Sequence, residues 1–150
     1  MIRVQREDFD VGAEIEALRT GNTAIGGIAS FVGTVRDFAG DTPVTAMTLE
    51  HYPGMTEREL ERIEQEANER WPLEGSLIIH RYGRLELGDR IVLVVTASAR
   101  RQAALESCAF LIDWLKTKAP FWKKEETPGG ENWVDARDSD DAAAARWHKD

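Results

Sequence analysis

Apolar positions recur with helical spacing in two long stretches of the chain. In the stretch that ends at Pro120, apolar or small side chains lie mostly three or four residues apart, which is typical of the buried face of an amphipathic helix. These positions are Ala104, Cys108, Leu111, Ile112 and Leu115. A second helix is predicted over residues 56–71, with a capping box made by Thr56 and Glu59 and a stop at Pro72.

Alternating apolar and polar positions predict two pairs of strands. Residues 25–36 and 44–52 are expected to form one antiparallel hairpin, and residues 76–87 and 90–97 a second, central pair. Glycines in the first strand, Gly26 among them, indicate a bulge or the close approach of another backbone. Two shorter helices, over residues 8–19 and 139–147, and a short strand over residues 133–137 complete the prediction.

This mixture of helices and antiparallel strands predicts an α+β fold, with an antiparallel sheet flanked by helices. A chain of 150 residues that is 42% hydrophobic is long enough for one well-buried domain, which is expected to span residues 1–150. The sequence has no apolar run long enough to cross a bilayer, and its first residues lack the apolar core of a signal peptide. A cytoplasmic protein is therefore expected.

Charge is distributed unevenly along the chain. The formal net charge is −8, which argues against general nucleic-acid binding, yet residues 99–124 carry +4 and the remainder −12. A basic patch on an acidic protein suits a small anionic ligand. The sequence contains no nucleotide-binding loop and no histidine or cysteine spacing typical of a metal site, so no cofactor is predicted. The single cysteine, Cys108, lies on the buried stripe and is interpreted as structural.

Four lysines crowd the stretch DWLKTKAPFWKKEE, residues 113–126, among bulky apolar side chains. They are Lys116, Lys118, Lys123 and Lys124. The ordinary interpretation is that the end of a helix attracts cations because its last carbonyls are unpaired. The alternative is that crowding and desolvation lower the pKa of one lysine, which makes it a usable base or nucleophile. The stretch alone does not decide between them.

Arginines add to this basic character at two other places. Ser98 is expected to cap the long helix, which puts Arg100 and Arg101 in its first turn, where a cation is unfavourable unless an anion binds there. Arg36 ends the first predicted strand and either binds an anion or is simply exposed to solvent. From the residues alone, the sequence thus predicts an anion site with candidate catalytic lysines.

Five ordered segments give the chain a more specific resemblance. The segments FVGTVRD, LEHYPGMTE, HRYGRLELGD, LKTKAPFWKKE and WVDARDSD resemble the large, catalytic subunit of molybdopterin synthase, from about residue 28 to residue 147. The resemblance implies a hammerhead-like α+β fold. It also implies a sulfurtransferase of molybdenum cofactor biosynthesis, which forms the dithiolene of molybdopterin from cyclic pyranopterin monophosphate.

The same resemblance implies two protein partners. Sulfur arrives on a small ubiquitin-like sulfur-carrier subunit whose C-terminal Gly-Gly is a thiocarboxylate and enters a pocket on the large subunit. The large subunit also forms a homodimer, so that the complete enzyme is a heterotetramer. Neither nucleic acid nor a membrane is an expected partner.

Residue roles follow from the resemblance position by position. Lys116 corresponds to the catalytic lysine of the family and Lys123 to its second essential lysine. Arg101 corresponds to an arginine that suits the substrate phosphate, because its planar guanidinium can bind two oxygens at once. Arg137 corresponds to an arginine contributed to the pocket of the neighbouring subunit. The substrate-binding set implied in this way is Thr34, Val35, Arg36, Arg100, Arg101, Lys123, Lys124, Glu125 and Arg137.

Arg100 is a departure from the family pattern, which has histidine at this position. Arginine keeps a positive charge, but it is not a plausible base at neutral pH. We therefore expect Arg100 to bind an anion or to orient the tail of the partner, and Lys116 to carry the proton transfers.

Two other function classes fit parts of the sequence. A non-catalytic interaction module could use the same basic pocket to bind an acidic tail or a C-terminal carboxylate. A phosphate-ester hydrolase would fit the cations but lacks an evident nucleophile with its base, or a metal set. Only the enzyme requires Lys116 and Lys123 to be indispensable separately.

Overall fold

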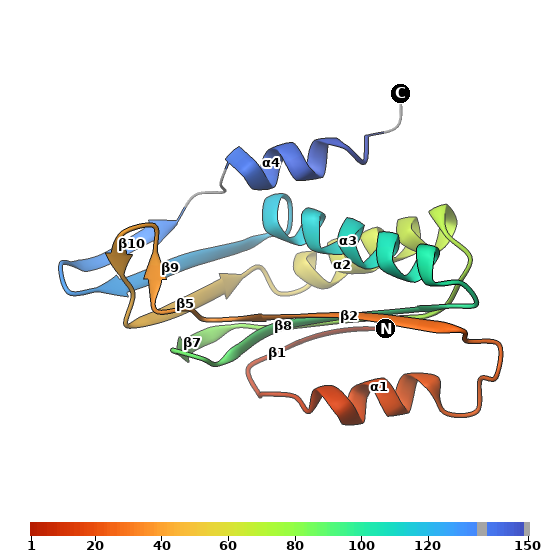
Figure 1. The fold of residues 1–150 in the computed structure, drawn as a ribbon. Coiled ribbons are helices and arrows are strands. Elements are labelled where there is room, and N and C mark those ends of the chain that lie inside the picture. The colour runs from red at the N-terminus through yellow and green to blue at the C-terminus, as the bar shows by residue number, and fades with distance from the viewer. Residues whose placement is uncertain (135–137, 149–150) are drawn as a thin grey trace.

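A four-stranded sheet with helices on both faces forms the centre of the protein (Figure 1). The computed structural model describes residues 1–134 and 138–148. In spatial order the strands of this first sheet are β1 (Ile2–Gln5), β6 (Leu73–Arg81), β8 (Arg90–Ser98) and β2 (Gly27–Thr34). Only β1 runs parallel to its neighbour, and the other pairs are antiparallel. The sheet is flanked by α1 (Val11–Arg19) on one face and by α2 (Met55–Arg70) and α3 (Arg101–Thr117) on the other.

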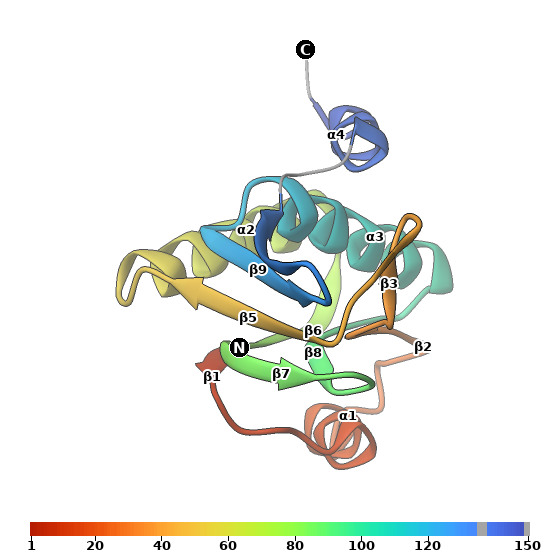
Figure 2. The same ribbon diagram turned by 90° about the vertical axis from the view of Figure 1, so that its left-hand side faces the viewer.

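A second, antiparallel sheet extends from one end of the first (Figure 2). In spatial order its strands are β10 (Gly130–Val134), β9 (Phe121–Thr127), β5 (Ala46–His51) and β7 (Gly83–Glu86). A small ribbon of β3 (Phe38–Ala39) and β4 (Thr42–Pro43) lies beside it. This arrangement confirms the predicted α+β class with antiparallel sheets flanked by helices.

Two predicted strand relationships are wrong. The strands near residues 25–36 and 44–52 do not pair with each other, because β2 pairs with β8 and β5 pairs with β7 and β9. The strand predicted over residues 76–87 is divided between β6, in the first sheet, and β7, in the second. The chain changes sheets at Gly83, whose φ of 93° is accessible to glycine and strained for other residues.

Both long helices are present, but each begins at a different cap from the one predicted. The N-cap of α2 is Gly54, whose N–H donates to Glu57 at 2.5 Å, so the capping box predicted for Thr56 and Glu59 is wrong. The N-cap of α3 is Arg100 rather than Ser98. Ser98 instead donates its hydroxyl to the Pro72 carbonyl at 2.9 Å, because it is still the last residue of β8.

Hydrophobic packing fixes the two faces of the first sheet. A large cluster, which includes Leu49, Leu85, Val94 and Leu111, joins both sheets to α2 and α3. A smaller cluster beneath α1 consists of Phe9, Leu77, Ile79, Leu93 and Val95. Cys108 is buried in the large cluster, in agreement with a structural role, and burial raises the pKa of its thiol to about 11.

The final helix, α4 (Asp138–Ala145), lies over α3 (Figure 1). Trp147, just beyond it, donates its indole N–H to Asp113 at 2.6 Å and packs edge-on against Trp71 and Phe110. The end of the chain is thereby tied to the outer surface of α3. None of the helices in residues 1–134 and 138–148 is both long and apolar enough to cross a membrane.

Gly26 marks the close backbone approach that the glycines of the first strand suggested. A Cβ at this position would lie 2.2 Å from the Ala99 carbonyl oxygen, where the chain passes from β8 into α3. The second feature, a bulge, occurs between Gly33 and Thr34, where the register of β2 on β8 shifts.

We expect Gly26→Ala to lower the free energy of unfolding by about 1–3 kcal/mol, because backbone atoms must move to admit the methyl group. Gly12→Ala is the matched control. In α1 the new Cβ would meet only Asp10 at 3.6 Å, and alanine favours helix by up to about 1 kcal/mol. Urea unfolding of both variants checks this prediction, and equal stability of the two would contradict it.

Candidate active site

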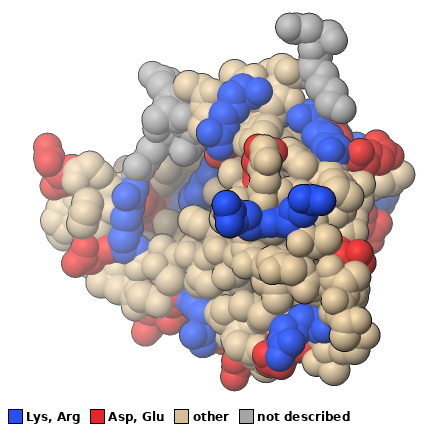
Figure 3. Space-filling view, turned by 45° about the vertical axis from the view of Figure 1, so that its right-hand side comes forward, with Lys and Arg blue, Asp and Glu red and all other residues tan. Residues whose placement is uncertain are grey.

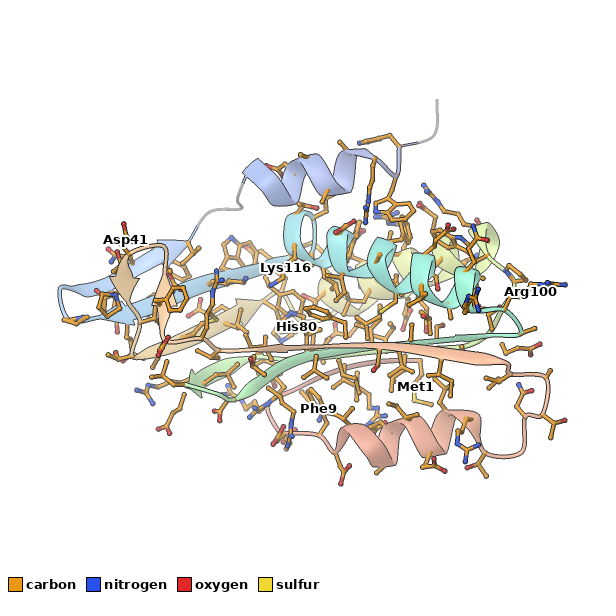
Figure 4. The ribbon with its side chains drawn as sticks, viewed as in Figure 1. Met1, Phe9, Asp41, His80, Arg100 and Lys116 are labelled. Atoms are coloured by element: carbon orange, nitrogen blue, oxygen red, sulfur yellow. The ribbon has the colours of Figure 1, made fainter. Side chains whose placement is uncertain are left out.

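Lysines from two different elements converge where α3 ends and the second sheet begins. Lys116 lies in the last turn of α3 and is exposed, and Lys123 lies in β9 and is half-buried. The charges of both act on the same buried side chain, His80 at the end of β6. Figure 4 shows Lys116 at the end of α3 above His80. The two lysines assigned by resemblance therefore both lie near His80.

The register of β9 on β5 turns Lys123 toward the interior. In this antiparallel pair, residues opposite each other have side chains on the same face of the sheet. Lys123 lies opposite Leu49, and Glu125 lies opposite Met47, and both of these apolar partners are buried in the core. A lysine and a glutamate on the core-facing side break the usual pattern of a strand, which is typical of a functional site.

Lys124 points to the other face of β9. It forms a salt bridge with Glu131 at 3.4 Å and lies over the ring of Trp133, with 5.5 Å between the ammonium nitrogen and the ring centroid. Both partners belong to β10, so Lys124 stabilises the hairpin of the second sheet. The structure thus separates Lys124 from Lys123, although the two are adjacent in sequence.

An aromatic floor lies beneath the lysines, made by His80, Phe121, His51 and Tyr82. The rings of His80 and Phe121 stack with centroids 3.7 Å apart and planes inclined by 15°. His51 lies 4.5 Å from Tyr82 and 6.0 Å from Phe121, measured between ring centroids. Strands of both sheets contribute to this floor, because β6 carries His80 while β5 and β9 carry His51 and Phe121.

Hydrogen bonds assign the donor nitrogen of each histidine in the floor. His80 Nδ1 lies 2.8 Å from the Arg81 carbonyl, which can only accept, so Nδ1 donates. His51 Nδ1 lies 3.1 Å from the Thr56 hydroxyl. That hydroxyl already donates to the Tyr52 carbonyl at 2.7 Å, so it accepts from His51. In both rings Nδ1 is therefore the bound donor.

The pKa of His80 is lowered to about 3, mainly by burial, and the nearby charges of Lys123, Lys116 and His51 contribute to the same shift. Only the hydrogen bond to the Arg81 carbonyl acts in the opposite direction. His80 is consequently a neutral imidazole at neutral pH, and it neither adds to the positive charge of the site nor serves as its general base.

The residues around Arg36 lie at the same end of the fold as Lys116. The strand β2 begins beside the N-terminus of α3 and runs toward the other end, where Thr34 and Arg36 are both exposed. Val35 is only 2% exposed, and its backbone N–H and C=O pair with Asp89 and Gly88. Val35 thus packs beneath this end of the fold. Because its side chain is buried, the structure does not favour the substrate contact predicted for it.

Arg100 and Arg101 lie at the opposite end of α3 from Lys116 (Figure 4). Residues 101 and 116 are separated by about 22 Å along a helix that rises 1.5 Å per residue. The basic patch predicted over residues 99–124 is therefore two separate groups of cations within one chain. Figure 3 shows the face of the molecule at the end where α3 begins. On this face, Lys and Arg side chains lie in small groups on a mostly uncharged surface.

Arg137, the remaining predicted site residue, lies outside the described residues.

Sequence reasoning missed His80, His51 and Phe121 as parts of the site. The segments that carry the resemblance contain all three, but no spacing in the sequence connects β5, β6 and β9. Their contact depends on the change of sheet at Gly83 and on the register of β9. Within the described part of the chain, no cluster of three or more His, Cys, Asp or Glu residues could hold a metal ion.

These features define an α+β protein whose two lysines, set over an aromatic floor, suit acyl or sulfur transfer. Comparison with known proteins makes the class specific. A family model described as MoaE protein matches residues 4–118. The molybdopterin synthase catalytic subunit of Ralstonia nicotianae is 56% identical over 146 residues, which is 97% of this chain and 83% of its own.

Solved structures agree with this assignment. The molybdopterin biosynthesis MoaE protein from Burkholderia ambifaria is 57% identical with a TM-score of 0.85, and the match covers 100% of this chain and 99% of that one. Molybdopterin synthase from Staphylococcus aureus is 30% identical with a TM-score of 0.81, covering 88% and 95%. The chain belongs to the MoaE family, the molybdopterin synthase catalytic subunits, and the predicted resemblance is confirmed.

We expect the free energy of unfolding to fall as the pH is lowered from about 6.5 to about 3, because of His80. The folded state keeps this imidazole neutral down to about pH 3, whereas the unfolded chain binds a proton near the ordinary value of 6.5. Over this window the unfolded state holds more protons, so the free energy of unfolding falls by at most about 1.4 kcal/mol per pH unit.

The measurement is urea unfolding at several pH values for the wild type, His80→Phe and His148→Gln. His80→Phe should flatten the acid limb, whereas His148→Gln, at an exposed position, should leave it unchanged. Parallel acid limbs for the wild type and His80→Phe would contradict the prediction.

Proposed function

We propose that this chain transfers sulfur from the thiocarboxylated C-terminus of a small ubiquitin-like subunit to cyclic pyranopterin monophosphate, which forms the dithiolene of molybdopterin. Membership of the MoaE family supports the reaction. The observation that connects this reaction to particular residues is that Lys116 of α3 and Lys123 of β9 both lie near His80. A non-catalytic module that only binds a tail would not need Lys116 and Lys123 to lie near the same residue. It would also not be expected to resemble catalytic subunits.

Lys116 is the residue that acts on the thioacyl carbon of the partner. It is exposed at the end of α3, so a thin Gly-Gly tail can reach it without opening the core. In the role proposed, Lys116 serves as the proton-transfer group or as a transient nucleophile. Lys123, half-buried on the inner face of β9, holds the extended tail and stabilises the negative charge that develops as sulfur leaves.

The cations around this pair bind the anionic substrate. Arg36 and Thr34 lie at the same end of the fold as Lys116, and Glu125 shares the inner face of β9 with Lys123. Because Arg36 also lies over the ring of Phe38, 5.7 Å from its centroid, its guanidinium is oriented by the β3 and β4 ribbon. Lys124 contributes from the other face by fixing the β9–β10 hairpin.

Two copies of the chain are needed to complete the proposed site. Arg100 and Arg101 are about 22 Å from Lys116 along α3, farther than one substrate molecule of this kind extends. If these arginines bind the phosphate of a substrate that reacts at Lys116, they must come from a second copy. A homodimer in which each site combines Lys116 of one copy with Arg101 of the other meets this requirement, and Arg137 is proposed to act across the same interface.

The proposal also includes a single catalytic domain over residues 1–150 and a cytoplasmic location. The hydrophobic cluster that joins both sheets to α2 and α3 supports the first. The single cysteine, which is free and buried, is compatible with a reducing compartment and supports the second.

The central prediction concerns Lys116→Ala. Because the variant lacks the amine that acts on the thioacyl carbon, we expect conversion of cyclic pyranopterin monophosphate to fall by at least about 100-fold, with binding of the small subunit retained. The assay combines this chain, the thiocarboxylated small subunit and the substrate. Lys118→Ala is the matched control, since that lysine is the C-cap of the same helix and should keep its turnover. Equal turnover in Lys116→Ala and the wild type would reassign the catalytic role.

A second prediction tests the shared site by mixing defective chains. Lys116→Ala and Arg101→Ala homodimers should each be nearly inactive. After subunit exchange, half of the dimers are mixed, and each contains one site with both residues intact, so about a quarter of the wild-type activity should return. If both residues act within one chain, mixing restores nothing. The measurement is product formation before and after exchange at equal total protein.

A further inference from the structure

The strand β2 leaves one edge of the first sheet open. Within residues 1–134 and 138–148, β2 pairs only with β8 and is the last strand on its side of the sheet. It is eight residues long, GIASFVGT, and carries no charged side chain and no proline. Natural proteins usually protect an edge with charges, prolines, bulges or short strands, because a long uncharged edge pairs readily with another chain. The register shift of β2 comes only at its last residue, so most of this edge is regular.

The other edge strands have the protection that β2 lacks. At the opposite edge of the first sheet, β1 has only four residues, and its Arg3 donates to Glu14 at 2.9 Å. In the second sheet, β7 carries Arg84 and Glu86, and β10 carries Glu131. Among these four edges, β2 is therefore the one best suited to pair with another strand.

An apolar strip on α3, made of Leu105, Ala109 and Ile112, lies beside this edge. Leu105 is 60% exposed, and the other two side chains are half-buried. With 3.6 residues per turn, these three positions share one face of the helix with Arg101 and Lys116, which bracket them. Exposed apolar side chains gathered in one place are typical of a surface that contacts another protein.

The strip faces away from the helices that pack on α3. Trp114 is turned toward α2, since Arg62 lies over its ring, and Asp113 is turned toward the end of the chain, since it accepts from Trp147. The strip lies on the remaining exposed side of the helix. Figure 2 shows α3 and β2 on one side of the molecule and α2 on the other, so the strip borders the open edge.

Phe31 joins the strip to the strand. It lies opposite Val94, which belongs to the large cluster beneath α2 and α3, so its ring is on the same face of the sheet as α3. The ring is nevertheless 36% exposed, because no strand of the described part of the chain lies beyond β2 on this side.

We propose that two copies of the chain join through this surface, made of the edge of β2 and the apolar strip, with the β2 strands of the two copies antiparallel. The two four-stranded sheets then continue into each other, and the two α3 helices lie side by side in opposite directions. The inference deepens the proposed function, on which the role of Arg101 in the shared site rests.

The strand and the helix give the same position for the two-fold axis. A Cβ at Gly27 would lie 3.3 Å from the Arg101 Cα, so β2 and α3 begin side by side, and they run in the same direction. If Arg101 faces Lys116 of the other copy, the axis crosses α3 midway, about 11 Å from Arg101. The same distance along β2, at about 3.3 Å per residue, ends near Ser30 and Phe31. Phe31 and the centre of the strip therefore both lie at the axis.

This arrangement completes the site that a single chain divides. The axis that brings Arg101 opposite Lys116 of the other copy also brings Leu105 opposite Ile112, because both pairs have the same midpoint along α3. The two cations repel each other across the interface unless an anion lies between them. The phosphate of the substrate therefore binds where the two copies meet.

The test measures the dissociation constant of the dimer by sedimentation velocity, without any reaction. Phe31→Lys should raise this constant at least about 100-fold and Leu105→Lys at least about tenfold, because each variant buries a charge in an apolar contact. Trp133→Lys is the matched control, since Trp133 is 58% exposed on β10, at the edge of the second sheet. Its constant should stay within about threefold of the wild type. If Phe31→Lys does not fold, Ser30→Lys on the same strand replaces it.

A disulfide locates the axis. Cα atoms opposite each other in antiparallel strands are about 4.5–5.5 Å apart, which is within the range that a disulfide bridges. Ser30→Cys or Phe31→Cys should therefore form a covalent dimer on mild oxidation, whereas Trp133→Cys should not. Cys108 is buried and should give no cross-link in the wild type.

Four results would overturn the proposal. They are a monomeric wild type at micromolar concentration, a dimer left intact by both Phe31→Lys and Leu105→Lys, a dimer that Trp133→Lys disrupts, and the absence of a cross-link in both Ser30→Cys and Phe31→Cys. Product formation is measured separately. If the copies join through β2 but the wild type makes no product, the proposed function fails and the interface remains, whereas turnover by a monomeric wild type removes the interface alone.

Discussion

The pairing of β9 with β5 is the constraint on which the site depends. Side chains alternate between the two faces of a strand, so the register of this one pair decides which lysine enters the interior. With Lys123 opposite Leu49 and Phe121 opposite His51, the inner face receives one cation and one aromatic ring. A slip of one residue would turn Lys124 inward instead and would move Phe121 away from His80. The salt bridge of Lys124 with Glu131 on the outer face reinforces the observed register.

The site combines the positive charge of two lysines with a buried imidazole that carries none of its own. Desolvation favours the neutral form of a buried imidazole, and the lysines nearby favour it further, so His80 stays uncharged where a third cation would be costly. Lys116 is exposed and Lys123 only half-buried, so both lie closer to solvent than His80 does. The positive potential is therefore directed outward, toward the surface that an anionic tail approaches.

Local sequence patterns predicted the elements of this fold better than their connections. The apolar stripe from Ala104 to Leu115 identified α3 correctly, because helical spacing reports burial on one face directly. The pairing of β2 with β8 could not be read in the same way, since a long connection, not a turn, separates these strands. The expected hairpin between the strands near residues 25–36 and 44–52 failed for this reason. Thr56 also resembled a cap in sequence, yet its hydroxyl is used by His51 and Tyr52.

The candidate site was predictable only as far as the resemblance reached. It assigned catalytic roles to Lys116 and Lys123, which the structure places around His80, although composition alone left a helix-end explanation open. It could not show that Arg101 and Lys116 lie at opposite ends of one helix, because the sequence merely places both in the same basic stretch. The length of α3 divides that stretch into two groups of cations about 22 Å apart along the helix. In the proposed function, the arginines at one end of α3 and Lys116 at the other act on one substrate only if they belong to two copies of the chain, which is why the proposal includes a dimer.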